Sequence, residues 1–246
     1  MPAHVAVNQR QIVAIGGSLS KMPDGAIAMM EYLITLTKNK ENCRILVMNT
    51  ATGDADSTKV FSYDVCSALS SPCKLSFLSF FARTPMDLSG LLLSQDMIFV
   101  NGGNTKSMLA VWREYGVDKL LAEAWASGIV LAGSSAGGIC WFDSCVTDSF
   151  AERYIAMPAL GILSGSCCPH YDGEIGRRAS YHAMITSGEL ADGYAIDEGT
   201  GIHFKGTEIH KIISVSPNTD AAAYKVRVAQ GGALEEEVLP SVRLVD

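Results

Sequence analysis

One short stretch of the chain restricts its fold more than any other. Residues 129–132 are apolar and rich in strand formers, which is typical of a strand buried on both faces. This run stops at Gly133, and from Ala136 onward the residues are small or apolar enough to enter a helix. Between the two lies Gly133-Ser134-Ser135-Ala136-Gly137, a G-x-S-x-G sequence. The pattern predicts a sharp turn from strand to helix with Ser135 at its tip.

The chemistry of acyl transfer explains why glycines flank this serine. A serine on such a turn has a strained backbone, and neighbouring side chains would clash there. The turn lifts the Ser135 hydroxyl out of the sheet and points the next N–H, that of Ala136, at a developing oxyanion, where the helix N-terminus adds positive charge. We therefore predict Ser135 as a nucleophile and Ala136 as an oxyanion donor. On the pentapeptide alone, a glycine-rich turn without chemistry is an equal alternative.

Strands and helices alternate along the first half of the chain. Apolar runs predict strands at residues 11–15, 44–49, 74–80, 97–100 and 129–132, and helical spacing predicts helices at 24–39, 57–68, 106–114 and 117–127. This alternation indicates right-handed crossovers and an α/β fold with a parallel sheet flanked by helices. In such sheets, ligands bind outside the carboxyl ends of the strands.

Two glycine-rich turns follow strands at those carboxyl ends, so we expect them to face each other across one cleft. One contains Ser135, and the other is residues 101–105, Asn-Gly-Gly-Asn-Thr. Gly102 and Gly103 lack side chains, so their N–H groups can approach a substrate closely. We choose Gly103 as the second oxyanion donor; the alternative is a turn that only reverses the chain. Residues 16–18 read as a tight turn, because G-x-G-x-x-G and the P-loop pattern are absent.

The second half of the chain has a different pattern of predicted elements. After Asp148, short strand-like runs separated by Gly, Asp and Asn turns occur at residues 160–163, 166–168, 194–196, 201–204, 208–215 and 222–228, and residues 177–187 read as a helix. The chain has no Pro-rich or Ser-rich linker and no internal repeat. We therefore predict one domain over residues 1–246, in which the strand-rich second half extends the mostly parallel sheet.

A serine nucleophile needs a base within hydrogen-bond reach, and the base needs an orienting group. The chain has five histidines. His170 stands at the end of a short strand where a loop begins, and such loops carry most catalytic side chains. The others lie in the polar start (His4), mid-helix (His182) or on strand-like segments (His203 and His210). We choose His170 as the base; the alternative is a loop histidine bonded to backbone.

Two consecutive acids, Asp197 and Glu198, stand at the junction of two strand-like runs, where one of them could face the cleft. Asp172 and Glu174 are closer to His170 in sequence, but they read as solvated loop residues. The chain order of a catalytic triad is then serine, histidine, acid. The pattern alone does not decide between Asp197 and Glu198.

These residues together resemble peptidase family S51, which includes the α-aspartyl dipeptidase peptidase E and has the cyanophycinases as relatives. The resemblance rests on the order and spacing of Gly102-Gly103-Asn104-Thr105, Gly133 to Gly137, Pro169-His170 and Glu198-Gly199, and it covers about residues 11–205. It implies a fold similar to the class I glutamine amidotransferase domain, and hydrolysis without a metal or other cofactor. It also implies Ser135 as nucleophile, His170 as base and Glu198, at the family's Glu-Gly position, as the third member of the triad.

One departure from the family concerns substrate recognition. Peptidase E has a longer segment after the catalytic histidine, and an arginine in it helps to recognise the substrate aspartate. Here the segment is short, residues 172–176, and Arg177 and Arg178 follow early. Either arginine could pair bidentately with a carboxylate, or could be an exposed residue at a helix start. We expect Asn104, Arg177 and Arg178 to bind the substrate, a small peptide with Asp-X dipeptides as one candidate.

Composition restricts the setting in which the protein works. The formal net charge of −7 argues against a general nucleic-acid binder. No apolar stretch reaches the roughly 18 residues of a membrane span, and residues 1–10 lack an apolar signal core, so we expect a cytoplasmic protein without a membrane partner.

The seven cysteines include no C-x-x-C pair and read as small buried residues. The expected partner is a small peptide substrate, and a homo-oligomer stays open.

Two other functions fit the sequence less well. An α/β-hydrolase esterase also uses G-x-S-x-G, but its triad runs serine, acid, histidine, which would need Asp172 or Asp197 with His203 or His210. Those histidines lie on strand-like segments, and no terminal helix follows them. The second is a catalytically inactive binding protein on the same fold, although the sequence keeps every group that the chemistry needs. A metal enzyme is least favoured, because no ligand cluster such as H-E-x-x-H occurs.

Overall fold

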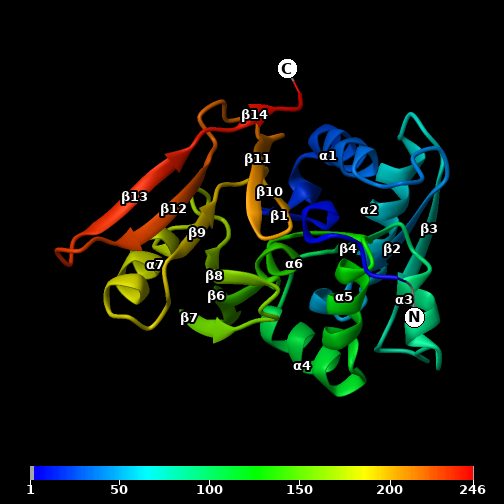
Figure 1. Cartoon of the computed structure of the whole chain (residues 1–246), viewed down its shortest axis with the longest axis horizontal. Helices are drawn as coiled ribbons and strands as arrows, with labels where there is room; N and C mark the ends of the chain where they lie inside the picture. Colours follow the sequence, from blue (N-terminus) through cyan, green and yellow to red (C-terminus); the bar gives the residue numbers. More distant parts are fainter. Residues whose placement is uncertain (1–2, 246) are drawn as a thin grey trace.

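The computed structural model describes residues 3–245 as two β-sheets, with most of the helices packed around the first (Figure 1). Sheet A has eight strands in the order β14-β11-β10-β1-β5-β4-β2-β3, and sheet B has six in the order β13-β12-β9-β8-β6-β7. The strands of sheet A are β1 (Gln11–Ile15), β2 (Cys43–Met48), β3 (Cys73–Leu78), β4 (Met97–Val100), β5 (Val130–Ser134), β10 (Thr200–Lys205), β11 (Glu208–Ser214) and β14 (Val242–Arg243). Those of sheet B are β6 (Phe142–Phe150), β7 (Arg153–Pro158), β8 (Leu163–Cys168), β9 (Gly193–Ile196), β12 (Ala223–Val228) and β13 (Leu234–Leu239). The helices are α1 (Pro23–Thr35), α2 (Asp56–Ser67), α3 (Leu88–Leu93), α4 (Thr105–Tyr115), α5 (Val117–Ala126), α6 (Ala136–Ile139) and α7 (Arg177–Thr186).

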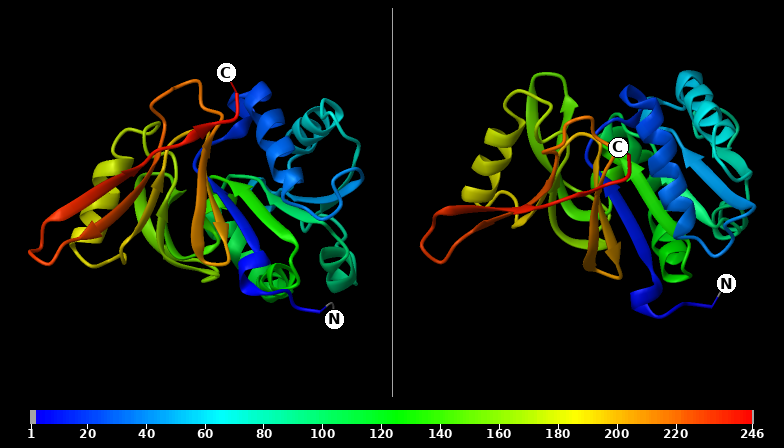
Figure 2. Two further views of the ribbon diagram at one scale, coloured as in Figure 1. Left: turned by 45° about the horizontal axis from the view of Figure 1, so that its top comes forward. Right: turned by 90° about the horizontal axis from the view of Figure 1, so that it is seen from above.

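The first five strands of sheet A form the parallel core that the alternating pattern predicts. β1, β5, β4, β2 and β3 pair in parallel. Successive side chains of β1 enter opposite layers, so Val13 and Ile15 pack with α1 while Ile12 and Ala14 pack with the core on the other face. Figure 2 shows helices on both sides of these strands. Burial on both faces explains why such strands read as continuous apolar runs.

The second half of the chain departs from the prediction of one extended, mostly parallel sheet. β10 runs antiparallel to both β1 and β11, which makes sheet A mixed. The strands β6 to β9, β12 and β13 form sheet B instead of joining sheet A. Antiparallel neighbours need only a tight turn, so this turn-rich half builds hairpins of its own, β6–β7 and β12–β13. The likeness to class I glutamine amidotransferases stays a prediction.

The two sheets share one apolar core. Phe142 at the start of β6 packs against Phe204 of β10, with ring centroids 5.9 Å apart, and against Tyr194 of β9 at 6.0 Å. Trp141, just before β6, is fully buried. The short helix α6 therefore ends where the chain crosses from sheet A to sheet B, and it leaves Ser135 at the junction of the sheets.

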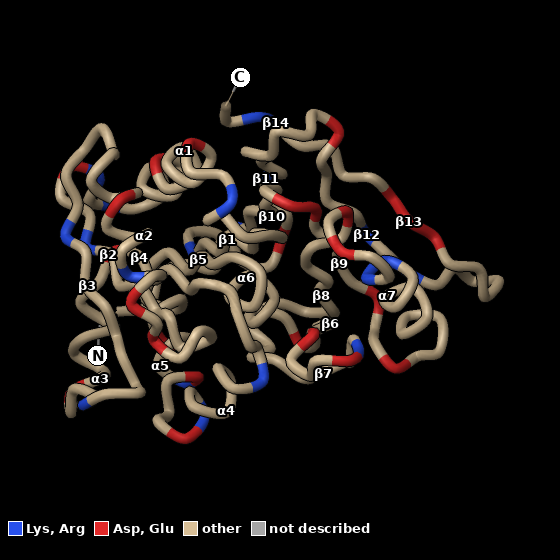
Figure 3. Tube along the Cα trace, turned by 180° about the vertical axis from the view of Figure 1, so that it is seen from behind, with Lys and Arg blue, Asp and Glu red and all other residues tan. Residues whose placement is uncertain are grey.

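Charged residues lie mainly at the edges of this arrangement. Figure 3 shows acidic residues along β13 beside basic residues of α7. An ion pair between Arg178 of α7 and Glu236 of β13 joins the two elements. Across residues 3–245, no helix is long and apolar enough to cross a membrane.

Candidate active site

Ser135 lies on the turn between β5 and α6 with the backbone strain that the G-x-S-x-G pattern predicts. Its φ is 53° and its ψ is −117°, an uncommon conformation for a residue with a side chain. The flanking glycines permit close packing. A Cβ on Gly133 would lie 2.3 Å from the carbonyl oxygen of Gly137, and a Cβ on Gly137 would lie 2.1 Å from that of Val100 in β4. Larger residues at either position would push the turn away from the sheet.

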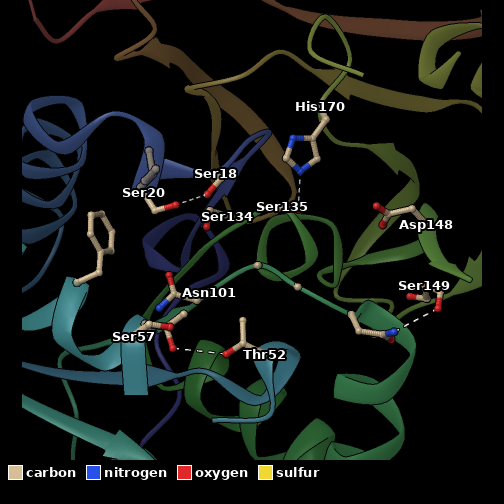
Figure 4. Close-up of a pocket in the computed structure, with 16 residues that line it drawn as sticks. Ser18, Ser20, Thr52, Ser57, Asn101, Ser134, Ser135, Asp148, Ser149 and His170 are labelled. Carbon is tan, nitrogen blue, oxygen red and sulfur yellow. Dashed lines mark hydrogen bonds between the residues drawn. The ribbon is translucent and has the colours of Figure 1, made fainter. Parts of the chain in front are cut away.

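Three side chains from separate loops form one hydrogen-bonded chain. The Oγ of Ser135 lies 2.7 Å from the Nε2 of His170, which follows β8 (Figure 4). The Nδ1 of His170 contacts the Oε1 of Glu198, which stands between β9 and β10. The backbone N–H of His170 donates to the carbonyl oxygen of Gly16, 2.8 Å away, and this bond fixes the histidine loop against the end of β1. The arrangement can pass a proton from the serine hydroxyl to the imidazole while a carboxylate stabilises the resulting charge.

Glu198 is held as a carboxylate by its neighbours. Burial alone would raise its pKa, but the hydrogen bond and charge of His170, with the backbone N–H of Ser18, bring the pKa below its usual value. That N–H donates to Oε2 over 3.1 Å. A Cβ on Gly17 would lie 1.8 Å from the same oxygen, so only glycine fits there. The turn at residues 16–18, which the sequence presents as a simple chain reversal, therefore positions the acid.

Asp197 points away from His170. It is 2% exposed, and its Oδ2 accepts hydrogen bonds from the backbone N–H of Ala222 at 2.9 Å and from the hydroxyl of Tyr224 at 3.1 Å. Burial raises the pKa of Asp197 to about 6. The structure therefore brings Glu198, and not Asp197, to the imidazole.

The glycine turn at residues 101–105 lies directly against Ser135. A Cβ on Gly102 would be 2.9 Å from the Cβ of Ser135, so this position must be glycine to leave the serine its place. Gly103 has a φ of 137°, and a Cβ there would be 2.4 Å from the carbonyl oxygen of Ala51. Within residues 3–245, the N–H groups of Gly102, Gly103 and Ala136 have no hydrogen-bond acceptor. They are therefore free to donate to a substrate oxygen beside Ser135.

Ser135 and His170 open into a cleft of about 630 Å³. Figure 4 shows Ser18 and Ser20 on one side of Ser135 and Asp148 and Ser149, from β6, on the other. The lining is mostly neutral and polar: Ser18, Leu19, Ser20, Thr52, Ser57, Thr58, Phe61, Asn101, Gly102, Gly103, Asn104, Ser134, Ser135, Asp148, Ser149 and His170. In the described part of the chain it contains no lysine or arginine.

Of the three residues predicted to bind the substrate, Asn104 is in the cleft lining and the two arginines are outside it. Asn104 lines the cleft, where its side chain caps α4 by accepting from the N–H of Ser107 and donates to the carbonyl oxygen of Ser149. Arg177 and Arg178 do not line the cleft, so the structure gives no support to the prediction that they bind the substrate. Arg177 is 1% exposed and bonds to Glu174 over 2.9 Å, and Arg178 pairs with Glu236. Helix α7 packs on sheet B, and this packing commits both guanidinium groups to neighbours within the protein.

The histidines of the alternative triad, His203 and His210, make their contacts away from Ser135 and His170. His203 of β10 is buried between the Tyr32 hydroxyl, 2.8 Å away, and the Oε1 of Gln11, 3.1 Å away, and burial lowers its pKa to about 4. His210 meets the His203 ring edge-on, with ring centroids 5.1 Å apart. Neither lines the cleft, so a serine, acid, histidine order has no base available. The described residues also contain no group of three or more His, Cys, Asp or Glu side chains that could hold a metal.

Comparison with known proteins assigns the family. The sequence profile of peptidase family S51 matches residues 12–212. The chain belongs to this family. The S51 chain is 40% identical over 221 residues to the "Uncharacterized peptidase YgaJ" of Bacillus subtilis (strain 168), over 90% of its own length and 94% of that protein's. The family predicted from the motifs is confirmed, and the chain is a peptidase.

Solved structures share the fold of this S51 peptidase. A peptidase from an acI-B1 Actinobacterium superposes with a TM-score of 0.67 at 18% identity, over 94% of both chains. A putative peptidase E protein from Listeria monocytogenes EGD-e superposes with a TM-score of 0.61 at 18% identity, over 84% of this chain and 99% of that one. At this level of identity the likeness establishes the mixed α/β fold alone.

Proposed function

We propose that this S51 peptidase is a serine peptidase that hydrolyses small peptides through an acyl-enzyme on Ser135. The observation that carries the proposal is the 2.7 Å contact from Ser135 Oγ to His170 Nε2, continued from Nδ1 to Glu198. His170 removes the hydroxyl proton as Ser135 attacks the peptide carbonyl, and then protonates the leaving amine. Glu198 orients the imidazole and stabilises its positive form. Water later attacks the acyl-enzyme by the same proton transfer.

The oxyanion of the tetrahedral intermediate needs donors beside Ser135. Ala136 supplies the N–H that follows the nucleophile, and Gly103 supplies a second from the facing turn. Their lack of other acceptors supports this role, because preorganised donors lower the barrier without rearranging. Gly102 contributes the empty space that lets the two turns approach.

The size and chemistry of the cleft favour short peptides. Its volume of about 630 Å³ is within the range of small-ligand sites. The neutral hydroxyl and amide groups of the lining, Asn104 among them, suit the peptide backbone, and Leu19 with Phe61 offers an apolar contact for a side chain. An Asp-X preference finds no support in this lining, since Asp148 would repel an acidic residue.

A dipeptide library incubated with the wild type and with Ser135→Ala tests the proposed function. We expect the wild type to release free amino acids from a subset of dipeptides and the variant to release none above background. An unchanged product profile in the variant would remove Ser135 from the reaction.

A further inference from the structure

The charge that the cleft offers to a substrate has one sign. Apart from His170 of the proposed triad, Asp148 is the one lining residue within 3–245 with an ionisable side chain. The other positions carry hydroxyl, amide, apolar or no side chains. A ligand in this cleft therefore meets a carboxylate and neutral dipoles.

The strand β6 holds Asp148 in the wall of the cleft. The pairing of β6 is irregular between Thr147 and Phe150, and the consecutive residues Asp148 and Ser149 both line the cleft. Thr147 is 1% exposed and bonds inward to Thr105 at 3.1 Å, whereas 59% of the Asp148 side chain is exposed. In Figure 4 its carboxylate lies across Ser135 from the wall formed by Ser18 and Ser20. A peptide bound over Ser135 would extend one end toward Asp148.

Asp148 shares the cation beside it, Arg177, with a second carboxylate, Glu174. The Nη2 of Arg177 is 3.6 Å from Oδ2 of Asp148, longer than a hydrogen bond. Arg177 instead bonds to Glu174 through Nε at 2.9 Å. One guanidinium between two carboxylates leaves one negative charge in excess. Arg177 is 1% exposed, so it lies on the protein side of Asp148. A substrate in the cleft therefore contacts the carboxylate and not the guanidinium.

We propose that Asp148 recognises a primary ammonium group of the substrate and so selects peptides that carry one near the scissile bond. This inference rests on the proposed function and adds the substrate class to it. An ammonium has three donors and no acceptor, which matches a carboxylate beside hydroxyls and carbonyls. The group comes either from a free peptide N-terminus or from a lysine side chain. An acidic residue in the same place would meet like charge.

Peptide pairs that differ in one charge distinguish these sources. The substrates are Ala-Leu, N-acetyl-Ala-Leu, N-acetyl-Lys-Leu and Asp-Leu, compared by kcat/KM in the wild type and in Asp148→Asn. The matched control is Glu152→Gln, which removes the same charge from the β6–β7 turn outside the cleft lining. Asp148→Glu keeps the charge, and thermal melting shows that each variant is folded.

We expect the wild type to prefer Ala-Leu over N-acetyl-Ala-Leu, and Asp148→Asn to reduce kcat/KM for Ala-Leu about 10- to 100-fold, mainly through KM, as for the loss of a charge-assisted hydrogen bond. Asp148→Glu should restore part of the loss, and Glu152→Gln should stay near wild type. If N-acetyl-Lys-Leu is also cleaved well and loses rate in Asp148→Asn, the lysine ammonium occupies the position. Both results support recognition of an ammonium.

Equal rates in the wild type and Asp148→Asn on Ala-Leu and on Asp-Leu, which both carry an N-terminal ammonium, would overturn the inference while leaving the serine peptidase intact. Reaction with a fluorophosphonate distinguishes failure of the ammonium inference from failure of the proposed serine peptidase function. A folded wild type that cleaves none of the four peptides and takes no label on Ser135 would overturn both.

Discussion

Glu198 and Asp197 are adjacent in sequence, yet only Glu198 contacts His170. The chain turns between β9 and β10 at these residues, with Gly199 at a φ of 71°, and consecutive side chains leave the turn on opposite sides. Glu198 faces the imidazole, while Asp197 accepts hydrogen bonds from Ala222 and Tyr224. One of the two acids thus contacts His170, and the other ties the turn to β12.

Glu198→Gln should reduce kcat about 10²- to 10⁴-fold with little effect on folding. The amide keeps the shape of the side chain but removes the charge that stabilises the imidazolium and favours the wrong tautomer of His170. The measurement is kcat on a cleaved dipeptide. Asp197→Asn is the control and should stay within about threefold of the wild type. A larger loss in Asp197→Asn than in Glu198→Gln would reverse the assignment of the acid.

Gly102→Ala should reduce kcat/KM about 10- to 100-fold, because the new methyl group would lie 2.9 Å from the Cβ of Ser135 and displace the nucleophile. Gly102 has no left-handed φ, so the backbone itself accepts alanine. Gly231→Ala, in the turn between β12 and β13, has no atom within 4 Å of its added Cβ and should leave the rate unchanged. The measurement is kcat/KM of both variants, with their melting temperatures to show that they are folded. Equal kcat/KM in Gly102→Ala and Gly231→Ala would mean that a side chain at position 102 does not displace Ser135.

Ser135→Ala and His170→Ala should each lower kcat about 10⁴-fold or more, and the double variant should be little worse than either single one. Groups that transfer one proton between them act as a unit, so their losses do not multiply. The rates of all three variants on one substrate complete the comparison. Independent, multiplying losses would show that the 2.7 Å contact between Ser135 and His170 is not used in a shared step.

His203→Gln should change how stability depends on pH. Burial, with the nearby His210, Lys205 and Lys211, lowers the pKa of His203 to about 4 in the folded state, against about 6.5 in the unfolded chain. As pH falls from 7 to 4, the unfolded state binds a proton at this residue before the folded state does, so the wild type loses stability. The free energy of unfolding of the wild type, minus that of His203→Gln, should fall by about 3 kcal/mol over this range.

The difference between the two proteins is the quantity to measure. Asp197, whose pKa burial raises to about 6, has the opposite effect: the folded state binds its proton first, so this residue adds stability as pH falls through 6 toward 4. The two effects partly cancel in the wild type, whereas the variant keeps only the effect of Asp197, so the difference between the two proteins isolates His203. Urea unfolding at several pH values gives both curves, and curves that stay parallel would contradict the buried, neutral state of His203.

The clustering of Ser135 with His170 could be predicted from the sequence because both residues stand in local patterns. The G-x-S-x-G turn marks Ser135 through the glycines that its packing requires, and His170 stands at a strand end. The choice of Glu198 over Asp197 came from the family resemblance, since neither residue carries a local signal of which way it points. The geometry agrees with that choice.

The walls of the cleft could not be predicted in the same way. Asp148 reaches the cleft because the chain crosses to sheet B at the start of β6, and residues 143–150, which mix polar and apolar side chains, give no sign of that crossing. Arg177 and Arg178 follow the histidine loop in sequence, but the packing of α7 on sheet B directs them to Glu174 and Glu236. Long-range packing, which sequence patterns do not report, decides both outcomes.

The identity of the nucleophile is most directly measured by reacting the folded protein with a fluorophosphonate and mapping the adduct by peptide mass spectrometry. Attack by an activated serine predicts one adduct on Ser135, absent from Ser135→Ala and strongly slowed in His170→Ala. Ser134→Ala serves as the neighbouring control and should be labelled at the wild-type rate, since Ser134 is the buried last residue of β5. An adduct on Ser134, or peptide hydrolysis that persists in Ser135→Ala, would contradict the mechanism.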